Sequence, residues 1–380
     1  MSRARPSGDV MLCIDPFTHH FEGDRLFEPE VDRFNGEDIL APYLHLRDWF
    51  EARGIPVHTA DRLERREVGA RVNIVVSFGL QRRYKALAKR ADVILSAFFA
   101  FESPVVDPSM YRGLPEAARH FKRMYSFSDS ESLEPVIGAR VPFEQFCLPY
   151  PFDDVCEDLW RRGNRRFLVM INHNKVPALR WKELYTERPA AVEFFARYGE
   201  IDLFGKGWDE VPYQMGRTWK PASVQRIERF FRNRWEQIHP TPVLEAARKV
   251  YKGPVPSKIE TLAQYTYCLV YDNVELEGWI TEKIFDCFVA GTIPIYWGAP
   301  DVERWIPADC FIDKRQFADY ADLRQYLHGL TARQIDAFRE AGRAFFRSQR
   351  FAPFSKRTFT ERLGRIVEED AGVPLFASVS

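Results

Sequence analysis

The sequence lacks net charge. Its 380 residues contain 54 lysines and arginines and 54 aspartates and glutamates. A chain without an excess of either sign has no overall field that would draw it to nucleic acid or to an anionic membrane. Nucleic acid is therefore not an expected partner. Any anionic ligand must be bound by a local cluster of cations.

Long apolar runs are also missing. The longest, VILSAFFAF at residues 93–101, has about half the length that spans a bilayer. The apolar stretch near the start ends at Asp15, too soon for a signal peptide. The six cysteines include no CxxC pair, which is typical of reduced core residues. The sequence thus predicts a cytoplasmic protein without a transmembrane segment, at most peripheral to the inner face of the membrane.

Several chemical motifs are absent as well. The chain has no GxSxG, no Walker loop and no GxGxxG, so hydrolase and nucleotide-kinase functions have no support. The polar clusters Asp153–Asp154, Asp129–Glu131 and His19–His20 fall in loops or in an expected linker, where solvent-exposed side chains are the simpler explanation. The sequence therefore predicts no metal site.

What is present is an alternation of short β-rich runs with helical ones. Runs such as VNIVVSF (72–78) and YTYCLVY (265–271) are apolar almost throughout, which is typical of parallel strands covered on both faces. Proline, acid and arginine clusters at 148–165 predict a linker. We expect an α/β protein of two Rossmann-like domains, residues 1–150 and 151–380, facing a central cleft. Residues 331–368 are predicted to be surface helices closing the second domain.

The segment EGWITEKIFDCFVAGTIPIYWGAP, residues 277–300, contains an electrostatic oddity. Apolar residues repeat at helical spacing, Thr281 is a typical N-cap and Gly291 a typical helix end. Lys283 therefore falls in the first turn, where the helix dipole disfavours a cation. Two interpretations stay open from these residues alone. Lys283 binds an anionic ligand such as a phosphate, or it pairs with a neighbouring acid on a solvated surface.

Residues 265–313 resemble the signature segment of the α1,3/α1,4-fucosyltransferases, glycosyltransferase family 10. In that family a strand ending in Phe-Glu-Asn is followed by Tyr-(Val/Ile)-Thr-Glu-Lys and a helix. Here Tyr271–Asn273 take the first three positions, Trp279 replaces the tyrosine, and Thr281–Lys283 match outright. Animal and plant members carry an amino-terminal membrane anchor, and because no such segment is predicted here, we expect a protein of the bacterial type.

Two more segments resemble the family less closely. FGKGW matches a family turn at Gly205, and counting back from it places the family's phosphate-binding arginine on Arg188. Arg180 is the alternative, because the loop at residues 175–186 is longer than in the family. Glu102 ends an apolar run in a Glu-Ser-Pro segment that the family carries on its acceptor side. Without the resemblance, Glu102 is better explained as a strand-end acid that caps the next turn.

The resemblance implies a GT-B fold and transfer of L-fucose from GDP-β-L-fucose to a glycan hydroxyl, of the α1,3 type, with inversion. Such a displacement needs a base for the hydroxyl and positive charge for the departing diphosphate. Glu102 would be the base, and Arg188 and Lys283 would hold the diphosphate. The first domain would face the acceptor and the second would bind the donor. The other donor-binding residues would be Gly205, Tyr271, Asn273, Trp279, Thr281 and Glu282.

The resemblance also implies an oligosaccharide or lipid-linked glycan as acceptor and no required cofactor. A divalent cation that stimulates the reaction stays an alternative. Two other functions stay open. One is a GT-B enzyme with another nucleotide-sugar donor, because Val274 and Trp279 depart from the family's pattern. The other is a catalytically silent protein that binds nucleotide sugars.

Overall fold

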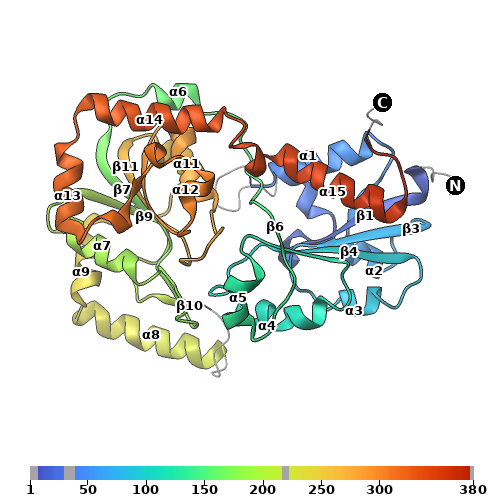
Figure 1. Cartoon of the computed structure of the whole chain (residues 1–380). Helices are drawn as coiled ribbons and strands as arrows, with labels where there is room; N and C mark the ends of the chain where they lie inside the picture. The colour runs from blue at the N-terminus through green and yellow to red at the C-terminus, as the bar shows by residue number, and fades with distance from the viewer. Residues whose placement is uncertain (1–6, 30–38, 216–221, 377–380) are drawn as a thin grey trace.

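The computed structural model describes residues 7–29, 39–215 and 222–376, which build two parallel sheets side by side (Figure 1). The first sheet has the order β2-β1-β3-β4-β5-β6. Strands β1 to β5 are largely apolar and buried, as the sequence predicted, whereas β6 is polar and exposed. They are β1 Val10–Asp15, β2 Val57–Thr59, β3 Val72–Ser77, β4 Val93–Ala100, β5 Arg123–Ser126 and β6 Glu144–Gln145.

Helices cover both faces of the first sheet, with α1 and the carboxyl-terminal α15 on one side and α3 to α5 on the other (Figure 1). The helices of this half are α1 Ala41–Glu51, α2 Ala60–Glu64, α3 Tyr84–Leu87, α4 Pro108–Ala117 and α5 Ser130–Ile137.

The second sheet has the order β13-β12-β11-β7-β9 and is also parallel. Beside it lies a two-stranded parallel pair, β8 Lys175–Pro177 and β10 Tyr213–Met215. The five strands of the main sheet are β7 Arg166–Ile171, β9 Ile201–Phe204, β11 Tyr265–Tyr271, β12 Ile293–Trp297 and β13 Ile312–Asp313.

Separate apolar cores fill the two faces of the second sheet. One lies under α10, α11 and α14, and the other under α7, α9 and α13. The helices are α6 Glu157–Trp160, α7 Glu187–Ala196, α8 Ala222–Ile238, α9 Pro242–Val250, α10 Lys258–Leu262, α11 Glu282–Ala290, α12 Val302–Trp305, α13 Tyr320–Gly329, α14 Ala332–Phe346 and α15 Lys356–Ala371. The predicted α/β fold with parallel sheets is confirmed.

One predicted assignment is wrong for the last helix. Residues 331–368 were expected to close the second domain, and α14 does so, but α15 packs on the first sheet and on α1. The apolar face of α15 causes this: Phe359 contacts Phe78 and Phe99 with ring centroids 5.8 and 5.7 Å apart, and Leu363 is fully buried in the same core. The chain thus crosses between the domains twice.

The loop before α11 fixes the second domain on the first. The ring of Trp279 lies 4.7 Å from that of Phe127, and the Ser128 hydroxyl donates a 2.6 Å hydrogen bond to the carbonyl of Glu277. Gly278 has φ +72°, and a Cβ there would lie 2.1 Å from the Phe127 carbonyl oxygen. Only glycine fits that backbone conformation and that approach.

Candidate functional site

A cavity of about 1000 Å³ lies between the two halves of the chain. The first half contributes Glu102 and Val106, which follow strand β4. Most of the lining comes from the carboxyl ends of β7, β9 and β11 and the segments after them. This is the edge of a parallel sheet where ligands bind in open α/β folds, so the predicted position of the cleft agrees with the geometry.

Helix α11 begins after Thr281 and ends at Gly291, whose φ of +68° suits a helix end. The Thr281 side chain does not cap the helix. Its hydroxyl donates a 2.5 Å hydrogen bond to the Asp272 carboxylate and accepts one of 2.9 Å from the Lys283 ammonium. Asp272 also accepts a 2.8 Å hydrogen bond from the Tyr296 hydroxyl. Burial raises the pKa of Asp272, and Lys283 and Thr281 oppose that rise.

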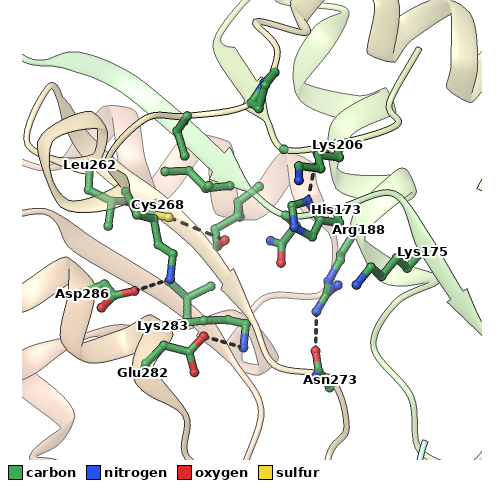
Figure 2. A pocket seen from close by; sticks show the side chains of 18 of the residues that line it. His173, Lys175, Arg188, Lys206, Leu262, Cys268, Asn273, Glu282, Lys283 and Asp286 are labelled. Carbon is green, nitrogen blue, oxygen red and sulfur yellow. Dashed lines mark hydrogen bonds and ion pairs between the residues drawn. The ribbon is translucent and has the colours of Figure 1, made fainter. Parts of the chain in front are cut away.

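Lys283 therefore combines features of both sequence interpretations. It lines the cavity, and it also lies within 3.5 Å of Asp272 and 3.4 Å of Glu282 (Figure 2). Asp286, another possible partner, instead pairs with Lys258 at 2.8 Å. The two carboxylates hold a cation in the first turn that the helix dipole would repel. A buried carboxylate from the preceding strand thus aims Lys283 into the cavity.

The structure separates the two candidate arginines. Arg188 lies in the first turn of α7, is 3% exposed and lines the cavity. Its Nη2 donates hydrogen bonds to the carbonyls of Tyr271 and Asp272, at 3.0 and 3.1 Å, and to Asn273 Oδ1 at 3.2 Å. Within the described residues it forms no ion pair, although the charges of Asp272 and Glu183 act on it, and its buried Nε has no hydrogen-bond partner there. Arg180 is mostly exposed, pairs with Glu183 and does not line the cavity.

Three further lysines line the cavity that the sequence did not single out: Lys175, Lys206 and Lys258. Figure 2 shows Lys175 and Lys206 beside Arg188. Within the described part of the chain, neither of these two forms an ion pair with an acid. Lys206 follows Gly205 at a strand end, and this position could have identified it as a site residue. The sequence around Lys175 and Lys258 offers no such feature. Together with Arg188 and Lys283, the cavity therefore gathers cations from five separate segments.

His173 is a neutral acceptor in this cluster. Its Nδ1 accepts a 2.9 Å hydrogen bond from the backbone N–H of Lys206, which requires that nitrogen to be unprotonated. Burial, together with the charges of Lys175 and Lys206, lowers the pKa of His173 to about 4. The histidine therefore fixes the Lys206 backbone and adds no charge near neutral pH.

Glu102 faces this cationic wall from the first domain. Burial raises the pKa of its carboxyl, while the Ser103 N–H, at 2.8 Å from Oε1, and the charge of Lys283 oppose the rise. The charge of Glu102 in turn acts on Lys175. A carboxylate with a raised pKa that lines a cleft is suited to accept a proton.

At Glu282 the neighbouring charges outweigh the effect of burial on the pKa, the reverse of Glu102. Burial by itself would raise its pKa, but Lys283 and Lys258 lower the pKa of Glu282 to about 2. It therefore remains ionised at neutral pH and can accept hydrogen bonds from ligand hydroxyls. In a single cavity, one carboxylate is set to take up a proton and another to remain charged.

The remaining predicted donor residues fall into two groups. Gly205 and Asn273 line the cavity. At Gly205, φ is +122° and a Cβ would lie 1.9 Å from the Asn172 carbonyl oxygen, so a side chain has no room. Three other predicted donor residues do not line this cavity, so their contact with the donor stays a prediction. These are Tyr271, Trp279 and Thr281.

Each of these three has a physical reason for its position. Tyr271 points to the opposite face of the sheet, where its hydroxyl lies 3.3 Å from that of Tyr320. Trp279 packs into the core of the first domain after the turn at Gly278. Thr281 is held under the helix start by Asp272. The three side chains therefore pack outside the cavity and hold the segments that line it.

Two features are absent from the described residues. No group of three or more His, Cys, Asp or Glu side chains is placed to hold a metal ion. Across the same part of the chain, no helix has the length and apolar character needed to cross a membrane.

Known proteins are similar to part of the chain. Residues 237–343 match the model described as glycosyltransferase family 10 (fucosyltransferase), C-terminal part. In this segment the chain is similar to glycosyltransferase family 10. The family 10 segment contains Asn273, Glu282, Lys283 and Lys258, so it supplies one wall of the cavity. Glu102, Lys175, Arg188 and Lys206 lie outside it.

Similar proteins match short parts of the chain. The α-(1,3)-fucosyltransferase FucT of Helicobacter pylori is 33% identical over 105 residues, 27% of this chain and 22% of that enzyme. The GDP-fucose protein O-fucosyltransferase 3 of Xenopus tropicalis is 44% identical over 48 residues, 13% of this chain and 10% of that protein. The match thus spans at most about a quarter of any of these three chains.

The fold extends over the whole chain. A solved α-glucosyltransferase in complex with UDP and a 13-mer DNA superimposes with a TM-score of 0.53 at 15% identity, covering 94% of this chain and 99% of that one. At this identity the likeness concerns the fold alone. It agrees with the GT-B arrangement of two Rossmann-like domains.

Proposed function

We propose that this protein transfers L-fucose from GDP-β-L-fucose to a hydroxyl of a glycan acceptor, with inversion at the anomeric carbon. One observation carries the proposal: a single cavity places Glu102 of the first domain opposite Arg188, Lys283 and the start of α11 in the second. The family 10 segment and the fucosyltransferases that it resembles support fucose as the sugar.

The cations suit the leaving group. A nucleoside diphosphate carries charge that increases as its bond to the sugar breaks, and preorganised donors stabilise that charge. The Arg188 guanidinium can bind two phosphate oxygens. Lys283 and the free N–H groups of the first turn of α11 add positive charge. Lys175 and Lys206 have no acid partner among the described residues and complete the set.

Glu102 suits the acceptor side. In the proposed step its carboxylate takes the proton of the acceptor hydroxyl, the hydroxyl oxygen forms a bond to the anomeric carbon, and the bond from that carbon to the diphosphate breaks. GDP leaves with the electron pair, and attack from the face opposite the diphosphate inverts the configuration. Glu282 accepts hydrogen bonds from the fucose hydroxyls. These cations supply the charge stabilisation themselves, so we propose that no metal is required and that EDTA leaves turnover unchanged.

Two variants test the roles separately. Lys283→Ala should weaken GDP-fucose binding in calorimetry, whereas Glu102→Gln should keep binding and lose about 100-fold or more in turnover. Lys249→Ala and Glu245→Gln, which alter an exposed pair on α9, are the matched controls. Full activity in both site variants would contradict the assignment.

The acceptor and donor classes need their own assay. Matching relatives include a GDP-fucose protein O-fucosyltransferase, so the panel should contain oligosaccharides, lipid-linked glycans and folded protein domains with exposed Ser and Thr. Calorimetry with GDP, UDP and GDP-mannose tests the donor. Tighter binding of UDP than of GDP would favour another nucleotide sugar, and donor binding without transfer to any acceptor would favour a silent binding protein. The six free cysteines support the cytoplasm as the place of action.

A further inference from the structure

Helix α8, Ala222–Ile238, is amphipathic with its apolar side facing solvent. Five apolar side chains on it are 57 to 72% exposed. They recur at helical spacing within one broad face and extend over about 16 Å at 1.5 Å per residue. These residues are Ile227, Phe230, Phe231, Trp235 and Ile238.

The side of α8 that faces the protein is polar. Arg229 and Asn233 donate hydrogen bonds of 2.8 and 3.2 Å to the Glu210 carboxylate, and Asn233 Oδ1 accepts one of 2.9 Å from the N–H of Val211. Glu236, one turn further on, is also largely covered. An ordinary surface helix buries its apolar face and exposes its polar one, so α8 is bound to the protein the opposite way round.

The charges on α8 indicate what could cover its apolar face. The chain as a whole is neutral, yet α8 contains four arginines and two glutamates, a net charge of +2. Arg226 and Arg232 are exposed on the two flanks of the apolar face, and Arg234 is exposed within it. A helix with Trp and Phe on one face and arginine beside them is typical of helices that lie in the plane of a membrane interface.

We propose that α8 docks on the surface of an anionic lipid bilayer, with Phe231 and Trp235 inserted at the level of the head groups. The arginines would pair with lipid phosphates, and Arg234 would extend its charged end to them while its stem stays in the apolar layer. Pairing with a second copy suits the face less well, because Arg234 of each copy would enter the apolar seam. This inference goes beyond sugar transfer and does not depend on it.

Docking through α8 would bring the bilayer close to the cavity. It follows β10 in the chain, and Met215 at the end of β10 lines the cavity. Figure 1 shows α8 along the outer edge of the second domain, with β10 beside it. A bilayer on α8 would therefore lie near the cavity, which suits an acceptor held at a membrane by a lipid.

Vesicle sedimentation with the full chain tests the proposal. Vesicles of phosphatidylcholine with about one third phosphatidylglycerol should bind the protein, and pure phosphatidylcholine vesicles should bind it far less. Phe231→Ser/Trp235→Ser and Arg232→Glu/Arg234→Glu should each weaken binding about tenfold or more. Tyr198→Ser, which removes an exposed aromatic residue outside α8, should change nothing. Added salt should weaken wild-type binding.

Three outcomes would overturn the proposal: no binding to the anionic vesicles, equal binding of the α8 variants, or equal binding to both kinds of vesicle. A protein that ignores vesicles but dimerises in sedimentation velocity, and loses the dimer in Phe231→Ser/Trp235→Ser, would show a second copy as the occupant. All variants alter exposed side chains, and unchanged GDP binding confirms that they are folded. If neither the wild type nor any variant transferred fucose, the proposed function would fail. The vesicle experiment would still test the docking of α8.

Discussion

The Lys283 ammonium lies 3.5 Å from the Asp272 carboxylate, across the turn that separates strand β11 from helix α11. Asp272 is fully buried and also binds the hydroxyls of Thr281 and Tyr296. A carboxylate that directly follows strand β11 therefore decides where the first lysine of the next helix points. Because Asp272 itself does not line the cavity, it acts through Lys283.

Asp272→Asn should therefore weaken GDP binding by about tenfold, since Lys283 loses its fixed position while the amide keeps the size of the side chain. Unfolding by urea should show a loss of about 1–3 kcal/mol, because a buried charge-assisted network is broken. Asp202→Asn, which removes a carboxylate paired with Arg166 and Lys252, is the control for stability without an effect on GDP. Unchanged GDP affinity in Asp272→Asn would contradict the inference that Asp272 positions Lys283 for GDP binding.

Arg188 and Arg180 should behave very differently. Arg188→Lys keeps the charge but loses the planar fork, so GDP-fucose affinity should fall by about 10- to 100-fold. Arg180→Lys alters an exposed pair with Glu183 and should stay within about twofold. Calorimetry on both proteins decides between them, and the reverse ranking would transfer the phosphate-binding role to Arg180.

The pH dependence of transfer should follow Glu102. Because burial raises the pKa of this carboxyl above its ordinary value, the base is lost on acidification at a higher pH than for an exposed glutamate. Turnover should fall as pH decreases through that raised pKa and level off above it. His173 stays neutral over this range because its pKa is about 4.

The control for this pH profile is GDP binding measured over the same pH values, which does not need the base. A flat turnover profile, or one that GDP binding follows in parallel, would count against Glu102 as the base.

Trp279 should matter for stability and not for the donor. Its side chain is 2% exposed and packs on Phe127 of the other domain, so Trp279→Ala should cost about 3–5 kcal/mol in urea unfolding. Trp279→Phe keeps an aromatic contact and should cost much less. Since Trp279 does not line the cavity, the Phe variant should bind GDP as the wild type does. Weaker GDP binding by Trp279→Phe would indicate that Trp279 contributes to the donor pocket.

The local elements could be predicted from the residues alone. The apolar strands, the helix between Thr281 and Gly291, the position of Arg188 in a first turn and the parallel sheets all follow from periodicity, caps and residues close in the chain. These features depend on neighbours within a few residues, so a single sequence contains them. The lysine in a first turn was visible for the same reason.

Which side chains meet at the cavity depends on contacts between segments far apart in the chain. Lys175, Lys206 and Lys258 join Arg188 because the strand order β12-β11-β7-β9 brings the ends of distant strands to one edge. Asp272 became the partner of Lys283, Trp279 turned to the other domain, and α15 returned to the first sheet. The outward apolar face of α8 also emerged only there, because periodicity shows that a helix has two faces but not which one the protein covers.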